Sequence, residues 1–248
     1  EQREQVRQDI QEAQELRENF DITNPNLPDI KEVKKNISDT KNYRSPLKAR
    51  DPRVRVAIVK KEGGTTRTEA AVARGLHWIA QHQNTNGSWS FDHRGGACQG
   101  RCGNPGRLAR DVKGATALAL LPFLGAGQTH KDGKYKKNVL AGLEFILGQA
   151  NETGHFMEPG GRMYSHGLCA ITLCEAFALT QDKGLRVPAQ KAIDFIVYAQ
   201  DEKGGGWRYS PKQAGDTSVM GWQVMALQSA RAAGLNVPKA TFSKANDY

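Results

Sequence analysis

Three potential metal ligands lie close together in one glycine-rich loop of the chain. His93, Cys98 and Cys102 follow the order H-x4-C-x3-C within residues 92–110. Imidazole nitrogen and thiolate sulfur are ligands that zinc prefers, so this loop is a candidate zinc site. A disulfide between Cys98 and Cys102 in an oxidising compartment, or two free thiols, are the alternatives that the spacing leaves open.

The other two cysteines stand in a different setting. Cys169 and Cys174 lie in an apolar stretch of helical composition, where a thiol behaves as a small hydrophobic side chain. We expect both to be packed in the core. Four cysteines in 248 residues are also too few for a small disulfide-bonded scaffold.

The elements that carry these residues repeat along the chain from Thr66 onward. Three blocks follow the order small, aliphatic, polar, aromatic, Ile, and each is followed by a block that is almost entirely apolar. The blocks are Gly75–Ile79, Gly142–Ile146 and Ala192–Ile196, with the apolar blocks Gly114–Leu120, Gly167–Leu173 and Gly221–Leu227. A period of about 50–55 residues with two helices per unit predicts a helical repeat array. We expect Trp78, Phe145 and Phe195 to be equivalent and buried.

The expected helices alternate between a mixed outer layer and an apolar inner layer. They cover residues 66–83, 111–127, 136–149, 164–182, 188–200 and 216–233, and a seventh begins at Pro238. Pro122 falls inside the second helix, where it should cause a bend that costs about 3 kcal/mol. Upstream, residues 53–59 (RVRVAIV) are the one strand that the sequence predicts.

Four polar residues mark the openings of the apolar inner helices. Asp111, Tyr164 and Ser218 align with one another, and His166 lies two residues after Tyr164. Polar groups that converge above an apolar surface are typical of a ligand pocket. We therefore predict that these four residues bind a ligand, with a structural role as helix caps as the alternative.

A similar turn follows each outer helix. The turns run from Gln83 to Trp89, from Gln149 to Phe156 and from Gln200 to Trp207, with glycine before each aromatic residue. Glycine adopts the left-handed conformation that ends a helix, and the aromatic side chain then folds back onto the bundle. We expect these aromatic residues to tie neighbouring helix pairs together.

These blocks and turns resemble the terpenoid cyclase and protein prenyltransferase superfamily, whose Q-x-x-x-G-x-W turns join the helices of an α/α toroid. The first turn fits the pattern as written, the third fits with one extra residue, and the second has an extra residue and Phe156 in place of Trp. The runs YSHGLC and GDTSVMGWQ look most like bacterial prenyltransferase/squalene-oxidase-repeat proteins. The resemblance covers about residues 66–248 and implies an all-α toroid of which about half a ring is present.

The resemblance also implies where catalytic chemistry would lie. Squalene-type cyclases protonate an alkene with an Asp-rich D-x-D-D-T motif, and the nearest match here, Gly215-Asp216-Thr217-Ser218, keeps one Asp. Asp216 is the catalytic candidate, and capping of the helix that follows it is the alternative. Prenyltransferases bind zinc through Asp, Cys and His; the nearest residues are His166 and Cys169, and no Asp-x-Cys pair occurs.

Two functions follow from the resemblance. The chain is expected to be a binding or scaffold module with an apolar central cavity, since the acid cluster and the zinc triad are not evident; the alternative is an isoprenoid-processing enzyme of the cyclase or prenyltransferase type. The expected ligand is an isoprenoid or another apolar molecule. Half a ring should leave the inward face of residues 164–181 uncovered, so we expect a protein partner or a C-terminal half beyond Tyr248 to complete it.

The first 65 residues have no counterpart in that family. They are expected to form a solvated helix and an extended arm, with residues 66–248 as the partial toroid of three helix pairs. The chain starts at Glu1 without an apolar run, so an upstream signal or membrane anchor stays open. The net charge of +9 comes from bases scattered among acids, and we therefore expect no nucleic acid as a partner.

Overall fold

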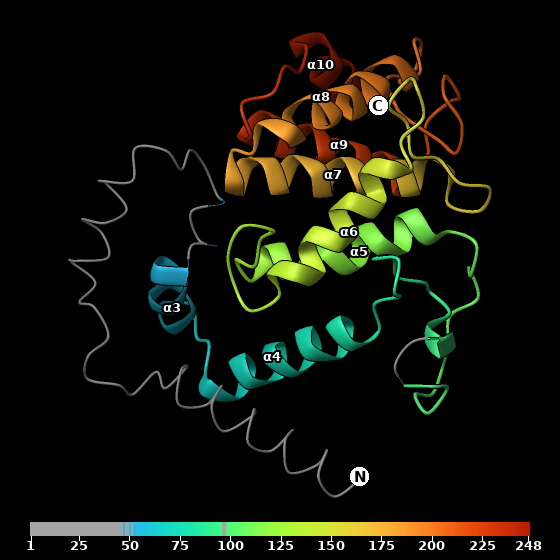
Figure 1. Ribbon diagram of the computed structural model, residues 1–248. Helices are drawn as coiled ribbons and strands as arrows, with labels where there is room; N and C mark the ends of the chain where they lie inside the picture. The colour runs from blue at the N-terminus through green and yellow to red at the C-terminus, as the bar shows by residue number, and fades with distance from the viewer. Residues whose placement is uncertain (1–46, 48–49, 51, 96–97) are drawn as a thin grey trace, which may run out of the picture. The chain divides into compact units, whose positions relative to one another are not determined.

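The computed structural model describes residues 47, 50, 52–95 and 98–248, and all regular structure in that part of the chain is helical (Figure 1). The elements are α3 Pro52–Lys61, α4 Thr66–Gln81, the short 3₁₀ helix η2 His93–Gly95, α5 Val112–Gly125, α6 Lys136–Gly148, α7 Arg162–Thr180, α8 Lys183–Ala199, α9 Thr217–Ala232 and α10 Lys239–Asn246. The all-α prediction is confirmed for these residues. The expected first helix and most of the expected arm lie outside them.

The chain divides into two compact units, Glu1–Ala80 and Gln81–Tyr248. The sequence placed a boundary after residue 65, so the division falls one helix later, and α4 belongs to the first unit except for its last residue. Among the described residues, no helix combines the length and the apolar character that a membrane span requires.

Residues 53–59 form part of α3, so the prediction of a strand there is wrong. Pro52 opens the helix, where its fixed φ is suitable and its missing N–H is not needed. Arg55 of α3 pairs with the buried Glu69 of α4, with Nη1 and Oε2 2.7 Å apart. An isolated strand leaves its backbone N–H and C=O groups without a ladder, whereas a helix satisfies them internally. Tertiary context therefore overrides the strand propensity of Val and Ile.

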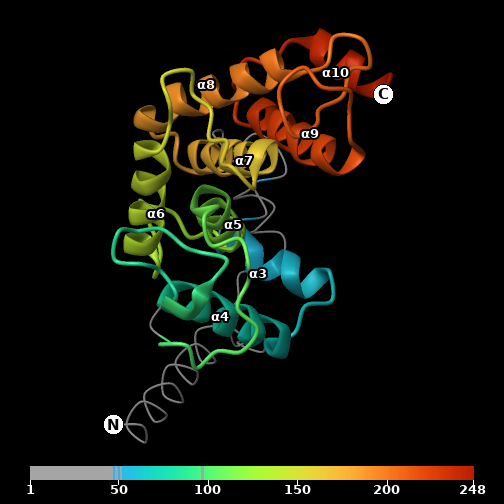
Figure 2. The same cartoon turned by 90° about the vertical axis from the view of Figure 1, so that its right-hand side faces the viewer.

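Helix α7 is the centre of the second unit. It packs against α5, α8 and α9, while α6 packs against α5, and α8 also packs against α9 (Figure 2). Because α7 has helical neighbours on several sides, 14 of its 19 residues are buried. The expected uncovered face is therefore not found on α7. Apolar exposure lies on the flanking helices instead, where Leu118 of α5 is 41% exposed and Met225 of α9 is 52% exposed.

The expected helices of the second unit are present with shifted ends, and the largest shift is at α8. This helix begins at Lys183 instead of residue 188, because the Asp182 carboxylate accepts a hydrogen bond from the Gly184 N–H at 2.9 Å and caps it. Pro188 consequently lies inside α8. Pro122 likewise lies inside α5, in its last turn and exposed to solvent.

The three turns that follow α4, α6 and α8 have the same backbone pattern. In each turn the first polar residue donates its N–H to a carbonyl four or five residues later, and a glycine N–H donates back to the carbonyl of that first residue. The pairs are Asn84 to Ser88 with Gly87 to Asn84, Asn151 to His155 with Gly154 to Asn151, and Asp201 to Gly206 with Gly205 to Asp201. The φ angles of the three glycines are +85°, +80° and +72°, and a Cβ on Gly87, Gly154 or Gly205 would collide with α6, α8 or α10 respectively. Only glycine combines this conformation with so close an approach.

The aromatic residue of each turn is buried against helices of the second unit. The backbone N–H of Trp89 donates to Thr116 Oγ1 of α5 at 2.9 Å, and the indole Nε1 of Trp207 donates to the Ile196 carbonyl of α8 at 2.8 Å. Phe156 is fully buried. The aromatic residues that were expected to be equivalent in the outer helices differ, because Phe195 is buried, Phe145 is half-buried and Trp78 is 43% exposed.

Candidate functional site

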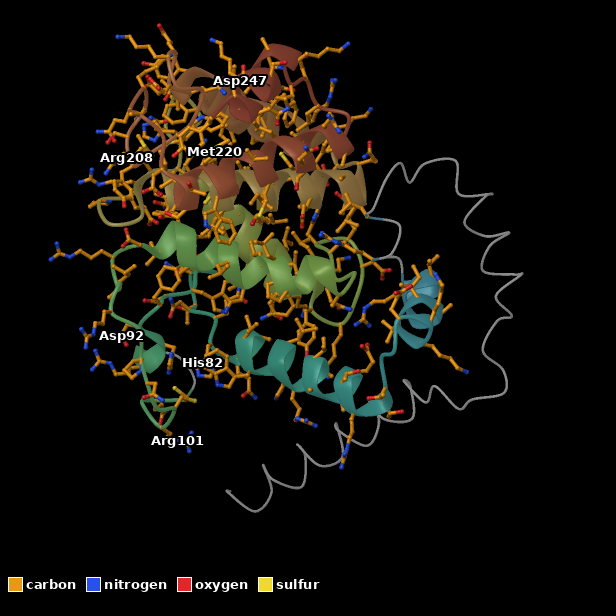
Figure 3. All side chains as sticks on the ribbon, turned by 180° about the vertical axis from the view of Figure 1, so that it is seen from behind. His82, Asp92, Arg101, Arg208, Met220 and Asp247 are labelled. Carbon is orange, nitrogen blue, oxygen red and sulfur yellow. The ribbon has the colours of Figure 1, made fainter. Side chains whose placement is uncertain are left out.

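The loop cysteines meet a histidine other than the one that the sequence suggested. The ligand atoms of His82, Cys98 and Cys102 all lie within 4.8 Å of one another, and Cys102 Sγ is 3.5 Å from His82 Nε2. We call these three residues the His82 cluster. His93, the third residue of the predicted set, is not in it; its ring stands edge-on to the His82 ring, with the centroids 5.6 Å apart. Figure 3 shows His82 beside the loop that carries Asp92 and Arg101.

Sequence spacing missed His82 because it precedes the loop and sits at the start of the first turn. The side chain of its neighbour Gln83 is held by three hydrogen bonds. Gln83 Nε2 donates to the Gly87 and Asn138 carbonyls, both at 2.9 Å, and Gln83 Oε1 accepts from Asn138 Nδ2 at 2.7 Å. The loop returns to this place because the Gly106 N–H donates to the Phe91 carbonyl at 2.9 Å. These bonds place His82 against the two cysteines.

Cys98 lies in a backbone conformation that directs N–H groups at its sulfur. Gln99 and Gly100 both have positive φ, +50° and +78°, so the chain curls around the Cys98 side chain. The N–H of Cys102 is the main cause that lowers the pKa of the Cys98 thiol to about 6; the Gly100 N–H and His82 act in the same direction. None of the four cysteines forms a disulfide. These N–H groups favour the thiolate form of Cys98 over the thiol.

The one carboxylate within residues 92–110, that of Asp92, is already paired with an arginine. Asp92 accepts hydrogen bonds from Arg94 Nε at 2.8 Å and from Arg94 Nη2 at 2.6 Å. This bidentate pair lowers the pKa of Asp92. Asp92 therefore forms an ion pair with Arg94 and does not belong to the His82 cluster.

Asp111, one of the predicted ligand-binding residues, holds the turn before α7. Its buried Oδ1 accepts hydrogen bonds from the N–H groups of Gly160 at 3.0 Å and Gly161 at 2.8 Å. A Cβ on either glycine would collide with Asp111 or with Ser165, so glycine is needed for the carboxylate to come this close. Asp111 is the N-cap residue of α5, but its side chain does not cap that helix and instead binds the turn before α7.

Glu158 makes the reciprocal contact and was not suggested by the sequence. Its two carboxylate oxygens accept from the N–H groups of Lys113 at 2.7 Å and Gly114 at 3.0 Å, in the first turn of α5. A carboxylate at this end of a helix also interacts favourably with the helix dipole. Glu158 and Asp111 together join the openings of α5 and α7. A residue that caps a helix 44 positions away gives no local sequence signal.

His166, the second predicted ligand-binding residue, is completely buried and uses both ring nitrogens inside the fold. Nδ1 accepts from the Phe156 N–H at 3.2 Å, so the proton lies on Nε2, which donates to the Ala192 carbonyl at 3.0 Å. Burial lowers the pKa of His166 to about 3. His166 is therefore a neutral link between a turn, α7 and α8, and it has no nitrogen left for a ligand.

Tyr164 and Ser218, the remaining predicted pair, are brought together across α7 and α9. Tyr164 Oη lies 2.5 Å from Ser218 Oγ, and Ser218 Oγ donates to Asp216 Oδ1 at 2.5 Å. Since the serine proton is used, the tyrosine hydroxyl is the donor of the first bond. The centroid of the Tyr209 ring lies 6.1 Å from the centroid of the Tyr164 ring. These groups form a short, partly exposed hydrogen-bond chain that ends on a carboxylate.

Asp216, the catalytic candidate, is the N-cap of α9. Its Oδ1 accepts from the N–H groups of Ser218 at 3.0 Å and Val219 at 3.3 Å. The Ser218 hydroxyl is the largest cause that lowers the pKa of Asp216, and the Val219 N–H adds to it. A carboxylate with a lowered pKa is ionised at neutral pH, whereas a proton donor needs a raised one. The surroundings of Asp216 therefore favour capping over proton donation.

The zinc chemistry of prenyltransferases has no suitable ligands at His166 and Cys169. The His166 nitrogens are both engaged, and burial is the main cause that raises the pKa of the Cys169 thiol. Cys169 Sγ lies 3.6 Å from the Lys113 carbonyl, as a thiol donor would. Cys174 is also buried with a raised pKa, so the prediction that both are core thiols is confirmed.

Comparisons of the chain with models of protein families, with curated proteins and with solved structures found no match.

Proposed function

We propose that the chain is a binding or scaffold module whose helices are arranged as in the α/α toroids of the terpenoid cyclase and prenyltransferase superfamily. Two features support this arrangement. Helices α5 and α9 flank α7, as successive inner helices of a ring would, and α8 packs against both α7 and α9. The turns after α4, α6 and α8 share one hydrogen-bond pattern and each buries an aromatic residue.

The observation that carries a non-catalytic role is the use of the polar residues at the helix openings. Asp111 accepts hydrogen bonds from two backbone N–H groups, and both ring nitrogens of His166 form hydrogen bonds with the backbone. Asp216 caps α9, and its pKa is lowered. Each of these groups stabilises the fold in its present protonation state. A catalyst of the cyclase type would need an acid with a raised pKa among them.

The apolar side chains of the flanking helices support a binding role. Leu118 of α5 and Met225 of α9 are exposed although both helices are mostly apolar. In a toroid, further inner helices lie on both sides of a group such as α5, α7 and α9. A protein partner, further residues of the same protein, or an isoprenoid or other apolar ligand would cover these side chains.

A turnover assay tests the non-catalytic role. The purified chain is incubated with squalene and, separately, with farnesyl diphosphate, Mg²⁺ and a thiol peptide, and the mixtures are analysed by mass spectrometry. We expect no product from the wild type or from Asp216→Asn. Product formation by the wild type that disappears in Asp216→Asn, with the same helix content by circular dichroism, would establish an enzyme instead.

Binding of a hydrophobic dye tests the role of the flanking helices. Leu118→Glu and Met225→Glu should each reduce the fluorescence of a bound dye relative to the wild type. Val187→Glu is the matched control, since Val187 is 62% exposed but lies on α8. If all four proteins bind the dye equally, α5 and α9 do not offer a binding surface.

A further inference from the structure

We propose that His82, Cys98 and Cys102 bind one zinc ion, with His82 Nε2 and the two sulfur atoms as ligands. The proposal does not depend on the binding or scaffold role. It also differs from the zinc set that the sequence suggested, because His82 replaces His93.

The spacing of the ligand atoms is close to that of a tetrahedral zinc site. With Zn–S near 2.3 Å and Zn–N near 2.0 Å, neighbouring ligand atoms in a tetrahedron stand about 3.5–3.8 Å apart. Cys102 Sγ and His82 Nε2 are 3.5 Å apart, and all three ligand atoms fall within 4.8 Å of one another. The largest of these separations exceeds the tetrahedral value by about 1 Å, so binding of one ion would draw the ligand atoms closer together.

The surroundings of the His82 cluster hold the ligands in the orientation that a metal needs. The N–H groups of Gly100 and Cys102 point at Cys98 Sγ, and such N–H···S bonds persist on a metal-bound thiolate because sulfur has more than one lone pair. The hydrogen bonds of Gln83 fix the backbone next to His82, and the edge-on ring of His93 limits the rotation of the His82 ring. Rotation of an imidazole is what most easily misplaces a metal ligand.

The cluster supplies three ligands from the described residues, and Asp92, the one carboxylate within residues 92–110, is paired with Arg94. Zinc is usually four-coordinate, so water or an external ligand would take the fourth position. A set of one nitrogen and two sulfurs is suited to zinc and to other borderline or soft ions, and unsuited to Mg²⁺ or Ca²⁺.

Metal titration of the full chain tests the proposal. The chain is purified with a phosphine reductant, stripped with a chelator, and titrated with Co²⁺ and then Zn²⁺ under nitrogen. We expect one ion per chain and the visible absorption bands of tetrahedral cobalt with thiolate ligands, which Zn²⁺ abolishes. Removing a supporting partner of a metal ligand costs 10–100-fold in affinity, so Cys98→Ser, Cys102→Ser and His82→Asn should each weaken binding by at least about 100-fold.

His93→Asn is the control that separates the two ligand sets, and it should bind within a few-fold of the wild type. His82 is buried, so its replacement by asparagine can also disturb the fold, and His82→Cys serves as a second variant. This variant should retain the metal and increase the sulfur-to-cobalt charge-transfer absorption. Absence of stoichiometric binding by the reduced wild type would overturn the proposal, whether or not a Cys98–Cys102 disulfide then forms. Loss of the metal in His93→Asn together with full binding by His82→Asn would also overturn it.

Discussion

The two pairs of cysteines show how one residue type acquires opposite chemistry in two regions of the same chain. In the loop, backbone N–H groups lower the pKa of Cys98 to about 6. In α7, burial raises the pKa of Cys169 and Cys174. In a helix interior the N–H groups are consumed by bonds to carbonyls four residues earlier, so none is available to a sulfur atom. The left-handed residues Gln99 and Gly100 leave the loop N–H groups free to turn toward Cys98.

Two histidines repeat the contrast. His166 of α7 donates to one backbone carbonyl and accepts from one backbone N–H, which makes it a structural link. His82 lies at the start of a turn and directs Nε2 at the sulfur of Cys102. The buried helix therefore commits its polar groups to the fold, whereas the loop presents them to one another.

Alkylation should give the largest difference between the two regions. In the metal-free chain at pH 7.5, iodoacetamide should label Cys98 at least about 1,000 times faster than Cys169 or Cys174, because the buried thiols react only after an opening that costs several kcal/mol. The fast rate should fall by about half near pH 6, where the Cys98 thiolate becomes protonated. Peptide mass spectrometry after timed quenching measures each site separately.

In this experiment Cys98→Ser is the control that should remove the pH-dependent phase with its midpoint near 6. Labelling of Cys169 at a rate comparable to Cys98 in the folded chain would contradict the buried environment of α7.

The pH dependence of stability should report the burial of His166 in α7. The folded pKa of His166, about 3, lies below the unfolded value of about 6.5, so between these values the unfolded state binds a proton that the folded state does not. The free energy of unfolding should therefore fall as the pH is lowered below about 6.5, with a slope that approaches about 1.4 kcal/mol per pH unit near pH 5. Burial also lowers the pKa of His155, which acts in the same window with a smaller effect, whereas the lowered pKa of Asp182 acts mainly below it. Urea unfolding at four pH values measures the slope.

His166→Gln should remove most of that slope, because glutamine keeps a donor and an acceptor but does not titrate. An unchanged slope in His166→Gln would assign the effect to other groups.

Serine substitutions should give the smallest difference. Cys174→Ser should lower the free energy of unfolding by about 1–3 kcal/mol, because it buries a hydroxyl among apolar side chains. Cys98→Ser in the metal-free chain should change it by less than about 0.5 kcal/mol, since the loop is partly exposed. Guanidinium unfolding of both variants beside the wild type measures the two changes. Equal losses would mean that the loop contributes to the core as much as α7 does.

The sequence by itself determined the helices from α4 onward, because their signals are local, whereas it predicted a strand for residues of α3. Apolar periodicity located α4 to α9 within a few residues, except at the start of α8, and the apolar block of α7 correctly predicted buried thiols at Cys169 and Cys174. The glycine and aromatic positions of the turns were also readable, since a left-handed backbone and a buried ring each favour particular residue types.

Two copies of the run G-L-x-V-P show what only the tertiary structure decided. Gly184 lies inside the first turn of α8, whereas Gly234 has φ +77° and lies beyond the end of α9, although the leucine that follows is buried in both places. The difference comes from Asp182, which caps α8 and is held by His130 at 3.0 Å and Lys131 at 3.2 Å. The residue two positions before Gly234 is Ala232, which cannot cap a helix.

The candidate site followed the same division. Spacing identified Cys98 and Cys102, because two ligands in one short loop are close in any conformation. It chose His93 over His82, and it gave no indication of Glu158, because those contacts depend on where the loop returns and which helix opening lies nearby. Local patterns fix which backbone groups are satisfied within a segment, but a contact between segments forms only when packing has brought them together, and that packing is a property of the whole core.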